Sequence, residues 1–306
     1  MTVDNSSTPT CSNAEDAVNV HPTKLNSIYD PDGIGLSIVP LSDPTREQLE
    51  TFTYERMKHC YAAKASLNKD LPLGSIPSGI PAARERSLKV FPQIDDVFSI
   101  VDYQGVFQSF LVSMVNAKRI LEIGTFMGIS AIFHANALKR SGVKGGADET
   151  GYKPIVCLEI SEQFAEVARS NFVDAGVEEY IEVIVGDANR SLAQLRDVTF
   201  DIVFIDADKD SYKSYYDTAI GDGLLNRTGI LIVDNTAFQS VVSYMDAPVP
   251  VDPEYKPLSF KFDMCKPTED WGITLHEFNE YIRNDPRTEV VMLPLFTGIT
   301  LVRFVN

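Results

Sequence analysis

Basic residues are scarce in this chain of 306 residues, which carries 27 Lys and Arg against 43 Asp and Glu and a formal net charge of −16. Nucleic acids and anionic membranes are bound through basic patches, so this imbalance argues against both as partners. The chain also lacks any apolar run near the roughly 18 residues that a membrane span requires. Its first residues show neither the basic nor the apolar segment of a targeting signal, and we therefore expect a cytoplasmic protein.

Cysteine and histidine are also scarce, with four of each. The cysteines are widely separated and the histidines share no metal-ligand spacing, which argues against a disulfide framework and against a zinc site. We expect reduced thiols, and imidazoles that are structural or at the surface. These residues are Cys11, Cys60, Cys157 and Cys265, and His21, His59, His134 and His276.

The hydrophobic content of 44% suffices for one large α/β domain with accessory segments. Residues 1–26 are rich in polar side chains and are predicted to form a disordered tail. Residues 27–95 are predicted to form a helical accessory segment, either a lid or a dimerisation surface. It has helices near 44–65 and 82–89 and a Pro- and Gly-rich break between them. Residues 96–306 are predicted to form the main domain.

Strands and helices alternate through the main domain. Short, continuous apolar runs predict strands buried on both faces, and stretches of helical spacing separate them. The pattern predicts an α/β fold with a doubly wound, Rossmann-like sheet, mostly parallel, with a C-terminal antiparallel hairpin that reverses one edge. The predicted strands are 119–123, 155–159, 181–185, 200–205, 229–234, 289–293 and 299–304. The predicted helices cover 106–115, 128–138, the stretch from the N-cap Ser161 to Gly176, 211–225 and 272–284.

Oxygen-bearing side chains end two neighbouring predicted strands. Asp206 follows the run FDIVFI, and Asp234 and Asn235 follow the run GILIV. A crossover helix between the runs makes the strands parallel, so their carboxyl ends would lie about 4.8 Å apart at one edge of the sheet. Three oxygen donors without Cys or His suit a hard divalent cation such as Mg²⁺. The alternative is that each residue only caps a helix, a position that Asp and Asn also favour.

Lys209 stands three residues past Asp206. A nearby dication disfavours the protonated ammonium, which would suit Lys209 to act as a general base. The alternative is a solvated surface lysine. The acidic cluster around it, Asp206, Asp208 and Asp210, could likewise be only a charged loop.

The turn from Glu122 to Gly128 (EIGTFMG) joins the first strand of the main domain to its helix. Glycines let the backbone approach a ligand there, but the G-x-G-x-x-G pattern is missing. A ligand without a pyrophosphate, such as S-adenosylmethionine, therefore fits better than a nicotinamide dinucleotide. Glu159 ends the second strand, where an acid commonly binds a ribose, and Asp187 with Ala188 ends the third, where a carboxylate could meet an adenine. The alternatives are an ordinary turn, a solvated acid and a helix cap.

Four segments, taken in order, resemble one family. They are 116–130 (NAKRILEIGTFMGIS), 200–212 (FDIVFIDADKDSY), 229–236 (GILIVDNT) and 293–303 (LPLFTGITLVR). From about Asp96 to Phe304, the chain resembles the cation-dependent S-adenosylmethionine O-methyltransferases of the caffeoyl-CoA and catechol type. The resemblance implies metal ligation by Asp206, Asp234 and Asn235, and catalysis by Lys209 together with Asp206. It implies contacts to S-adenosylmethionine from Glu122, Gly124, Ser130, Glu159, Ala188 and Asp208.

By this resemblance, the reaction is a direct methyl transfer to a hydroxyl of a small aromatic acceptor, with the metal on the acceptor oxygens and Lys209 taking the proton. The resemblance also implies a homodimer. The alternatives are a carboxylate O-methyltransferase with little need for metal and a non-catalytic ligand-binding module on the same fold. Residues 98–101, 139–153 and 238–271 depart from the family, and we expect the last of these to govern acceptor specificity.

Overall fold

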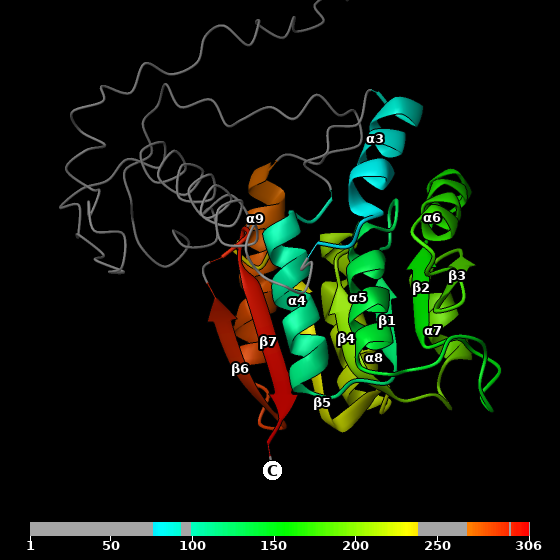
Figure 1. Cartoon of the computed structure of the whole chain (residues 1–306). Coiled ribbons are helices and arrows are strands. Elements are labelled where there is room, and N and C mark those ends of the chain that lie inside the picture. Colours follow the sequence, from blue (N-terminus) through cyan, green and yellow to red (C-terminus); the bar gives the residue numbers. More distant parts are fainter. Residues whose placement is uncertain (1–75, 93–98, 238–267, 294, 306) are drawn as a thin grey trace, which may run out of the picture.

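The computed structural model describes residues 76–92, 99–237, 268–293 and 295–305 (Figure 1). Within these ranges, one seven-stranded sheet has the strand order β3-β2-β1-β4-β5-β7-β6. Strands β1 to β5 are parallel, β7 runs antiparallel to β5, and β6 runs antiparallel to β7. The strands are β1 (Ile120–Ile123), β2 (Ile155–Glu159), β3 (Ile181–Val185), β4 (Phe200–Ile205), β5 (Leu225–Asp234), β6 (Thr288–Leu293) and β7 (Ile299–Phe304).

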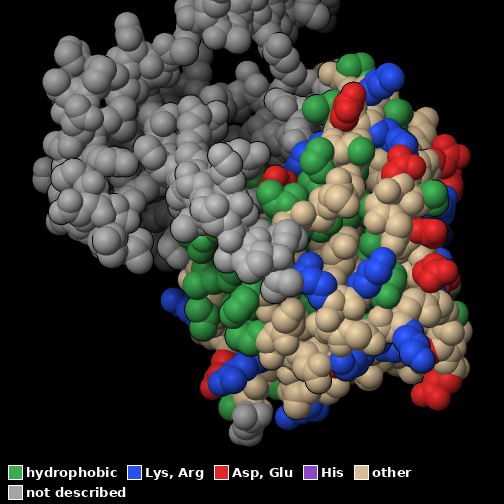
Figure 2. All heavy atoms as spheres, viewed as in Figure 1, with side chains coloured by type: hydrophobic (Ala, Val, Ile, Leu, Met, Phe, Trp, Pro, Cys, Tyr) green, Lys and Arg blue, Asp and Glu red, His purple; other side chains and the backbone are tan. Residues whose placement is uncertain are grey.

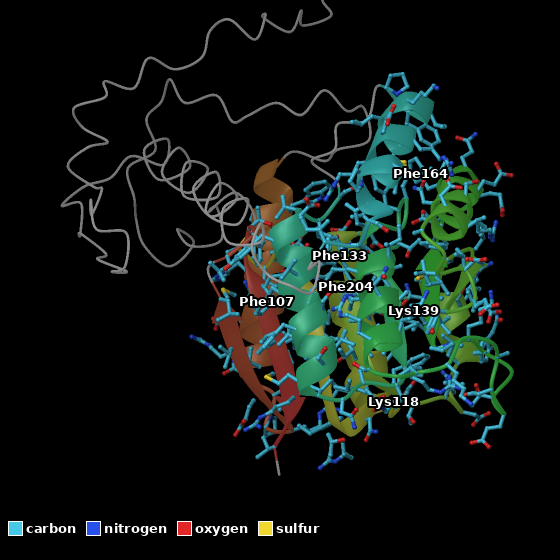
Figure 3. All side chains as sticks on the ribbon, in the orientation of Figure 1. Phe107, Lys118, Phe133, Lys139, Phe164 and Phe204 are labelled. Atoms are coloured by element: carbon cyan, nitrogen blue, oxygen red, sulfur yellow. The ribbon has the colours of Figure 1, made fainter. Side chains whose placement is uncertain are left out.

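Helices cover both faces of the sheet. Successive strand residues point to opposite sides, and because both sets are apolar, each face has to be buried. Ile120 and Phe204 pack into one apolar cluster, which also contains Phe133 (Figure 3). Their strand neighbours Leu121 and Val203 pack into a second cluster on the opposite face. The first face is covered by α3 (Ile80–Val90), α4 (Asp102–Met114), α5 (Ile129–Arg140) and α6 (Glu162–Asp174), and the second by α7 (Ala188–Gln194), α8 (Tyr212–Gly221) and α9 (Thr268–Arg283).

The strand order places the topological switch point of the sheet beside β1. This strand pairs with β2 on one side and with β4 on the other, so the direction of winding reverses there. Open α/β sheets bind ligands outside the carboxyl ends of the strands at such a point. The register of β4 and β5 pairs Ile205 with Val233, so Asp206 and Asp234 leave the sheet side by side.

Most of the predicted architecture is confirmed. The strands at 155–159, 181–185 and 200–205 have the predicted bounds, and the hairpin of β6 and β7 is antiparallel. Strand β5 begins at Leu225 rather than at residue 229, and the crossover helix α8 accordingly ends earlier than predicted, at Gly221. The reversed strand is β7, and it lies one place in from the edge, because β6 forms the edge itself.

The buried face of α4 differs from the prediction. The helix exists, but Phe110 and Met114 of its predicted apolar face are 64% and 61% exposed. Gln104 and Gln108 are buried instead, because their amides bond to partners beneath the helix. The apolar spacing alone could not reveal these polar partners, which belong to other elements.

Several expectations fall outside the described residues. The predicted tail at 1–26, the helix at 44–65 and most of the segment 238–271 lie there. The division of the chain into an accessory segment and a main domain stays a prediction. In the portion that is described, no helix is long and apolar enough to cross a membrane.

Candidate active site

The three predicted cation ligands lie together at the carboxyl ends of two paired strands. Asp206 directly follows β4, Asp234 is the last residue of β5, and Asn235 comes next. Asp234 is 3% exposed, and its carboxylate accepts hydrogen bonds of 2.8 Å from Gln104 Nε2 and of 2.7 Å from the Asn235 backbone amide. We call Asp206, Asp234 and Asn235 the candidate cation site.

Lys209 lies at the same point, in the short 3-10 helix η2 (Lys209–Ser211), and is 8% exposed. Its Nζ donates to Asp206 Oδ1 at 3.3 Å and to Asn235 Oδ1 at 2.7 Å. A third bond of 2.6 Å runs from Nζ to the hydroxyl of Tyr212, which itself donates to the backbone carbonyl of Asp234 at 3.2 Å. Lys209 is therefore not a solvated surface lysine, since its ammonium is engaged at the candidate cation site.

Burial makes the two carboxylates of this site costly to ionise. Burial is the main cause that raises the pKa of Asp234 to about 8, and the charge of Asp206 acts in the same direction. Burial also raises the pKa of Asp206, and the Lys209 ammonium opposes that shift. A divalent cation held by these residues would offset the repulsion that ionisation of both carboxylates creates.

The donor set fits such a cation. It offers carboxylate and amide oxygens and neither thiolate nor imidazole, which suits Mg²⁺ better than zinc. Among the residues that the structure describes, no three His, Cys, Asp or Glu side chains gather at one point, and the predicted set accordingly counts the amide oxygen of Asn235 as its third donor. Ligation stays a prediction, supported by this oxygen chemistry and by the position of the three residues.

The predicted cofactor turn packs against the candidate cation site. Gly124 has φ +90°, and a Cβ at this position would lie 2.1 Å from the backbone oxygen of Asp206. Gly128, with φ +84°, is the N-cap of α5, and a Cβ there would lie 2.4 Å from the ring of Phe172. Only glycine fits at either position, and the turn can therefore lie close to the ends of β1 and β4 at once.

Glu159 ends β2 and is 6% exposed, so it is not a solvated acid. Its Oε2 accepts a 2.6 Å hydrogen bond from the backbone amide of Phe126, and its Oε1 accepts one of 2.9 Å from the amide of Ser161. Burial raises the pKa of Glu159, and these amide donors partly oppose the shift. The carboxylate thus connects the cofactor turn with the start of α6.

Glu122 is fully buried on β1 and bonds to side chains near it in the chain. Its Oε1 accepts hydrogen bonds of 2.7 Å from Thr125 and 2.8 Å from Ser130. Its Oε2 lies 3.3 Å from His134 Nδ1, and His134 Nε2 lies 2.8 Å from Gln108 Oε1. This buried polar chain joins two predicted cofactor residues, Glu122 and Ser130, to α4.

The last three predicted cofactor residues lie at the starts of helices. Asp187 is exposed and caps α7 by accepting a 2.9 Å hydrogen bond from the Asn189 amide, and Ala188 is the first residue of that helix. Asp208 is exposed and caps η2, and it also accepts a 2.8 Å hydrogen bond from the hydroxyl of Tyr215. Asp187 therefore acts as a helix cap, which was the alternative role considered for it. A contact between Asp187 and the cofactor stays a prediction.

Sequence reasoning missed three residues that contact the candidate cation site. Gln104 bonds to Asp234 from 130 residues away in the chain, and no local pattern could indicate this. Tyr212 lies within the FDIVFIDADKDSY segment, where its spacing from Lys209 was the available signal. Thr297 accepts a 2.8 Å hydrogen bond from Asn235 Nδ2, and it lies in the LPLFTGITLVR segment, to which no role was assigned.

Comparison with known proteins points to one family. A family model described as O-methyltransferase matches residues 89–305. Caffeoyl-CoA O-methyltransferase 2 of Populus trichocarpa is 32% identical over 206 residues, which cover 65% of this chain and 72% of the relative. Catechol O-methyltransferase of Mycobacterium tuberculosis is 41% identical over 132 residues, which cover 43% of this chain and 54% of the relative.

A solved structure agrees with these relatives. SAH-bound Podospora anserina methyltransferase PaMTH1 has a TM-score of 0.65 to this chain at 26% identity, covering 81% of this chain and 96% of that one. The matched residues include all four segments on which the family resemblance was based, and that resemblance is confirmed. The chain belongs to the O-methyltransferase family, in the group of the caffeoyl-CoA and catechol enzymes.

Proposed function

We propose that this O-methyltransferase transfers the methyl group of S-adenosylmethionine to a hydroxyl of a small aromatic acceptor, assisted by a divalent cation, Mg²⁺ by its chemistry. The observation that carries the proposal is the meeting of two features at one edge of the sheet. The oxygen groups and Lys209 gather at the ends of β4 and β5, and Gly124 of the cofactor turn lies against Asp206. Methyl donor and acceptor would therefore meet beside the same strand end.

The cofactor side of the proposal rests on the turn after β1 and on Glu159. PaMTH1, which resembles this chain in fold, is described as SAH-bound, and SAH is what remains of S-adenosylmethionine once its methyl group has left. Buried Glu159 would bind the ribose from the end of β2, where an acid commonly does so in such sheets. Gly124 in the turn after β1 and Ser130 at the start of α5 would contribute further contacts to S-adenosylmethionine.

Asp206, Asp234 and Asn235 would hold the cation, and a bound cation would supply electrostatic stabilisation of the developing oxyanion of the acceptor. A nearby dication disfavours the ammonium form of Lys209. As the neutral amine, Lys209 would receive the hydroxyl proton at Nζ, which lies beside Tyr212, Asp206 and Asn235. The acceptor oxygen forms a bond to the methyl carbon as the bond from sulfur to carbon breaks. The sulfonium becomes a neutral thioether, and orientation of the two substrates contributes much of the rate.

Methyl transfer from labelled S-adenosylmethionine tests the proposal, with catechols, monophenols and aromatic acids as acceptors, each in Mg²⁺ and in EDTA. We expect activity on catechol-like acceptors that is lost in EDTA and restored by Mg²⁺. Activity on aromatic acids that survives EDTA would overturn the role of the cation and favour a carboxylate O-methyltransferase. Binding of S-adenosylmethionine without transfer to any acceptor would argue against the aromatic acceptor class.

A further inference from the structure

The side-chain amide of Asn235 has a fixed partner at each end. Its Nδ2 donates to Thr297 Oγ1 at 2.8 Å, and its Oδ1 accepts from Lys209 Nζ at 2.7 Å. Asn235 itself has φ +59°, in the left-handed region, directly after β5. The orientation of this amide matters because an amide oxygen ligates a cation and an amide NH₂ does not.

Both partners favour the same orientation. The Lys209 ammonium can only donate, so it requires the oxygen of the amide. Thr297 Oγ1 accepts from Asn235 Nδ2 through a lone pair, which leaves its own proton for the backbone carbonyl of Phe296 beside it. Thr297 therefore holds the NH₂ end of the amide, which directs Oδ1 toward Lys209.

The backbone of the turn between β6 and β7 sets the position of this hydroxyl. Phe296, Thr297 and Gly298 have φ of +55°, +71° and +92°, which is costly for the first two residues. The turn is held by the Thr236 amide, which donates to Gly298 O at 3.1 Å, and by the Ala237 amide, which donates to Thr297 O at 2.9 Å.

Aromatic packing holds the turn from its other side. The ring of Phe296 is 5.5 Å from Tyr103 and 6.2 Å from Phe107, measured between centroids, and both partners belong to α4. A Cβ on Gly298 would lie 2.2 Å from the backbone nitrogen of Ala237, so only glycine allows the turn to lie this close to the chain just after β5. Strained backbone that is held this firmly is typical of functional sites.

We infer that Thr297 is a positioning residue that turns the Asn235 amide so that its oxygen faces the cation. The inference rests on the proposed function, because it needs a cation to be bound at Asp206, Asp234 and Asn235. A merely structural Thr297 would stabilise the turn and leave cation affinity unchanged. Partners of metal ligands typically contribute 10–100-fold to affinity, so the two roles can be separated by measurement.

The test compares Thr297→Val with Thr297→Ser in the full chain. Valine keeps the β-branched shape at φ +71° and removes the hydroxyl, whereas serine keeps the hydroxyl. Affinity for Mn²⁺ is measured by calorimetry without S-adenosylmethionine or acceptor, and Tm is measured without metal. We expect Mn²⁺ affinity to fall about 10–100-fold in Thr297→Val and to stay close to wild type in Thr297→Ser.

If Thr297→Val fails to fold, Thr297→Gly replaces it, because glycine lacks the hydroxyl and adopts positive φ without strain. Wild-type affinity for Mn²⁺ in a folded variant without the hydroxyl would overturn the inference and leave the proposed function intact. Absence of Mn²⁺ binding in the wild-type protein would overturn the cation role in the proposed function, and this inference with it.

Discussion

Gln104 on α4 donates a 2.8 Å hydrogen bond to the carboxylate of Asp234 at the end of β5. Both side chains are buried, and 130 residues separate them in the chain. The bond ties the helix that precedes the sheet to the candidate cation site. Tyr103 and Phe107 of the same helix pack against Phe296 in the turn between β6 and β7. Helix α4 therefore contacts the candidate cation site directly, through Asp234, and also contacts the turn that contains Thr297.

Replacing Gln104 with leucine should weaken the folded state. The change leaves a buried Asp234 oxygen without its donor, and such an unsatisfied group costs about 1–3 kcal/mol. The free energy of unfolding, measured by urea denaturation, should fall by that amount. Gln194→Leu, at the exposed end of α7, is the control and should stay within about 0.5 kcal/mol of wild type. Equal effects of the two substitutions would contradict the role of the buried bond.

Asp206→Ala and Asp234→Ala should each abolish turnover. Removing a ligand should lower activity more than about 100-fold, since even outer partners of a metal site contribute 10–100-fold. Calorimetry should find binding of S-adenosylmethionine largely intact, because all predicted cofactor contacts except Asp208 come from segments other than those of the candidate cation site, from β1 to the start of α5 and at the ends of β2 and β3. Asp197→Ala is the control: this exposed residue precedes β4, at the opposite end from Asp206. Turnover near wild type in both ligand variants would refute the metal mechanism.

The residues at the carboxyl ends of the buried strands are the part of the site that the sequence predicts best. A parallel strand buried on both faces is a short apolar run, so the polar residue that follows it marks the carboxyl end. This reasoning placed Glu159, Asp206 and Asp234 at one edge of the sheet, where the structure has them. The parallel pairing of β4 and β5 followed from the length of the crossover between them.

Contacts between distant side chains could not be read in this way. Apolar spacing predicted α4 but assigned Phe110 to the buried face, whereas Gln104 and Gln108 lie there. Burial of these glutamines depends on polar partners, and those partners, Asp234 for Gln104 Nε2 and His134 for Gln108 Oε1, lie on other elements. Such pairs depend on how the helix is placed on the sheet. The hydrophobic periodicity of a single segment does not indicate that placement.

His134 should contribute to stability through its buried polar neighbours. The sequence indicated only that it was structural or at the surface, and the structure buries it fully between Gln108 and Glu122. His134→Leu removes the polar neighbour of both and should lower the free energy of unfolding by about 1–3 kcal/mol. Lys139→Leu, exposed on the same helix (Figure 3), is the control and should change it by less than about 0.5 kcal/mol. A loss no larger than that of the control would show that the buried chain contributes little.

We propose that the chain forms a homodimer through exposed apolar side chains of α4 and β6. Phe110 and Met114 on α4 and Val291 and Met292 on β6 are 41–64% exposed, and Figure 2 shows apolar side chains gathered over β6 and β7. Contiguous exposed apolar patches commonly mark interfaces. Wild-type protein should sediment as a dimer, and Phe110→Asp should shift it to a monomer.

The control for the interface is Val173→Asp, which alters an equally apolar side chain, 59% exposed, on α6. A charge placed there should leave the dimer intact. A monomeric wild type, or equal dissociation by both substitutions, would rule out the α4 and β6 surface.

Gly124→Ala should damage both halves of the site, because this residue lies where the cofactor turn meets the candidate cation site. Its added Cβ would lie 2.1 Å from the backbone oxygen of Asp206, a distance that real Cβ atoms do not show. Either the turn or the end of β4 must therefore move. Affinity for S-adenosylmethionine and affinity for Mn²⁺, each measured by calorimetry, should both fall in the same variant.

Gly142→Ala separates this clash from the general cost of a side chain at positive φ. Gly142 has φ +78°, close to the +90° of Gly124, but a Cβ there would meet nothing within 4 Å. It should lose only the roughly 1–2 kcal/mol that a left-handed alanine costs and keep wild-type affinity for both ligands. If Gly124→Ala behaved the same way, the close contact between the turn and Asp206 would not couple cofactor binding to the cation site.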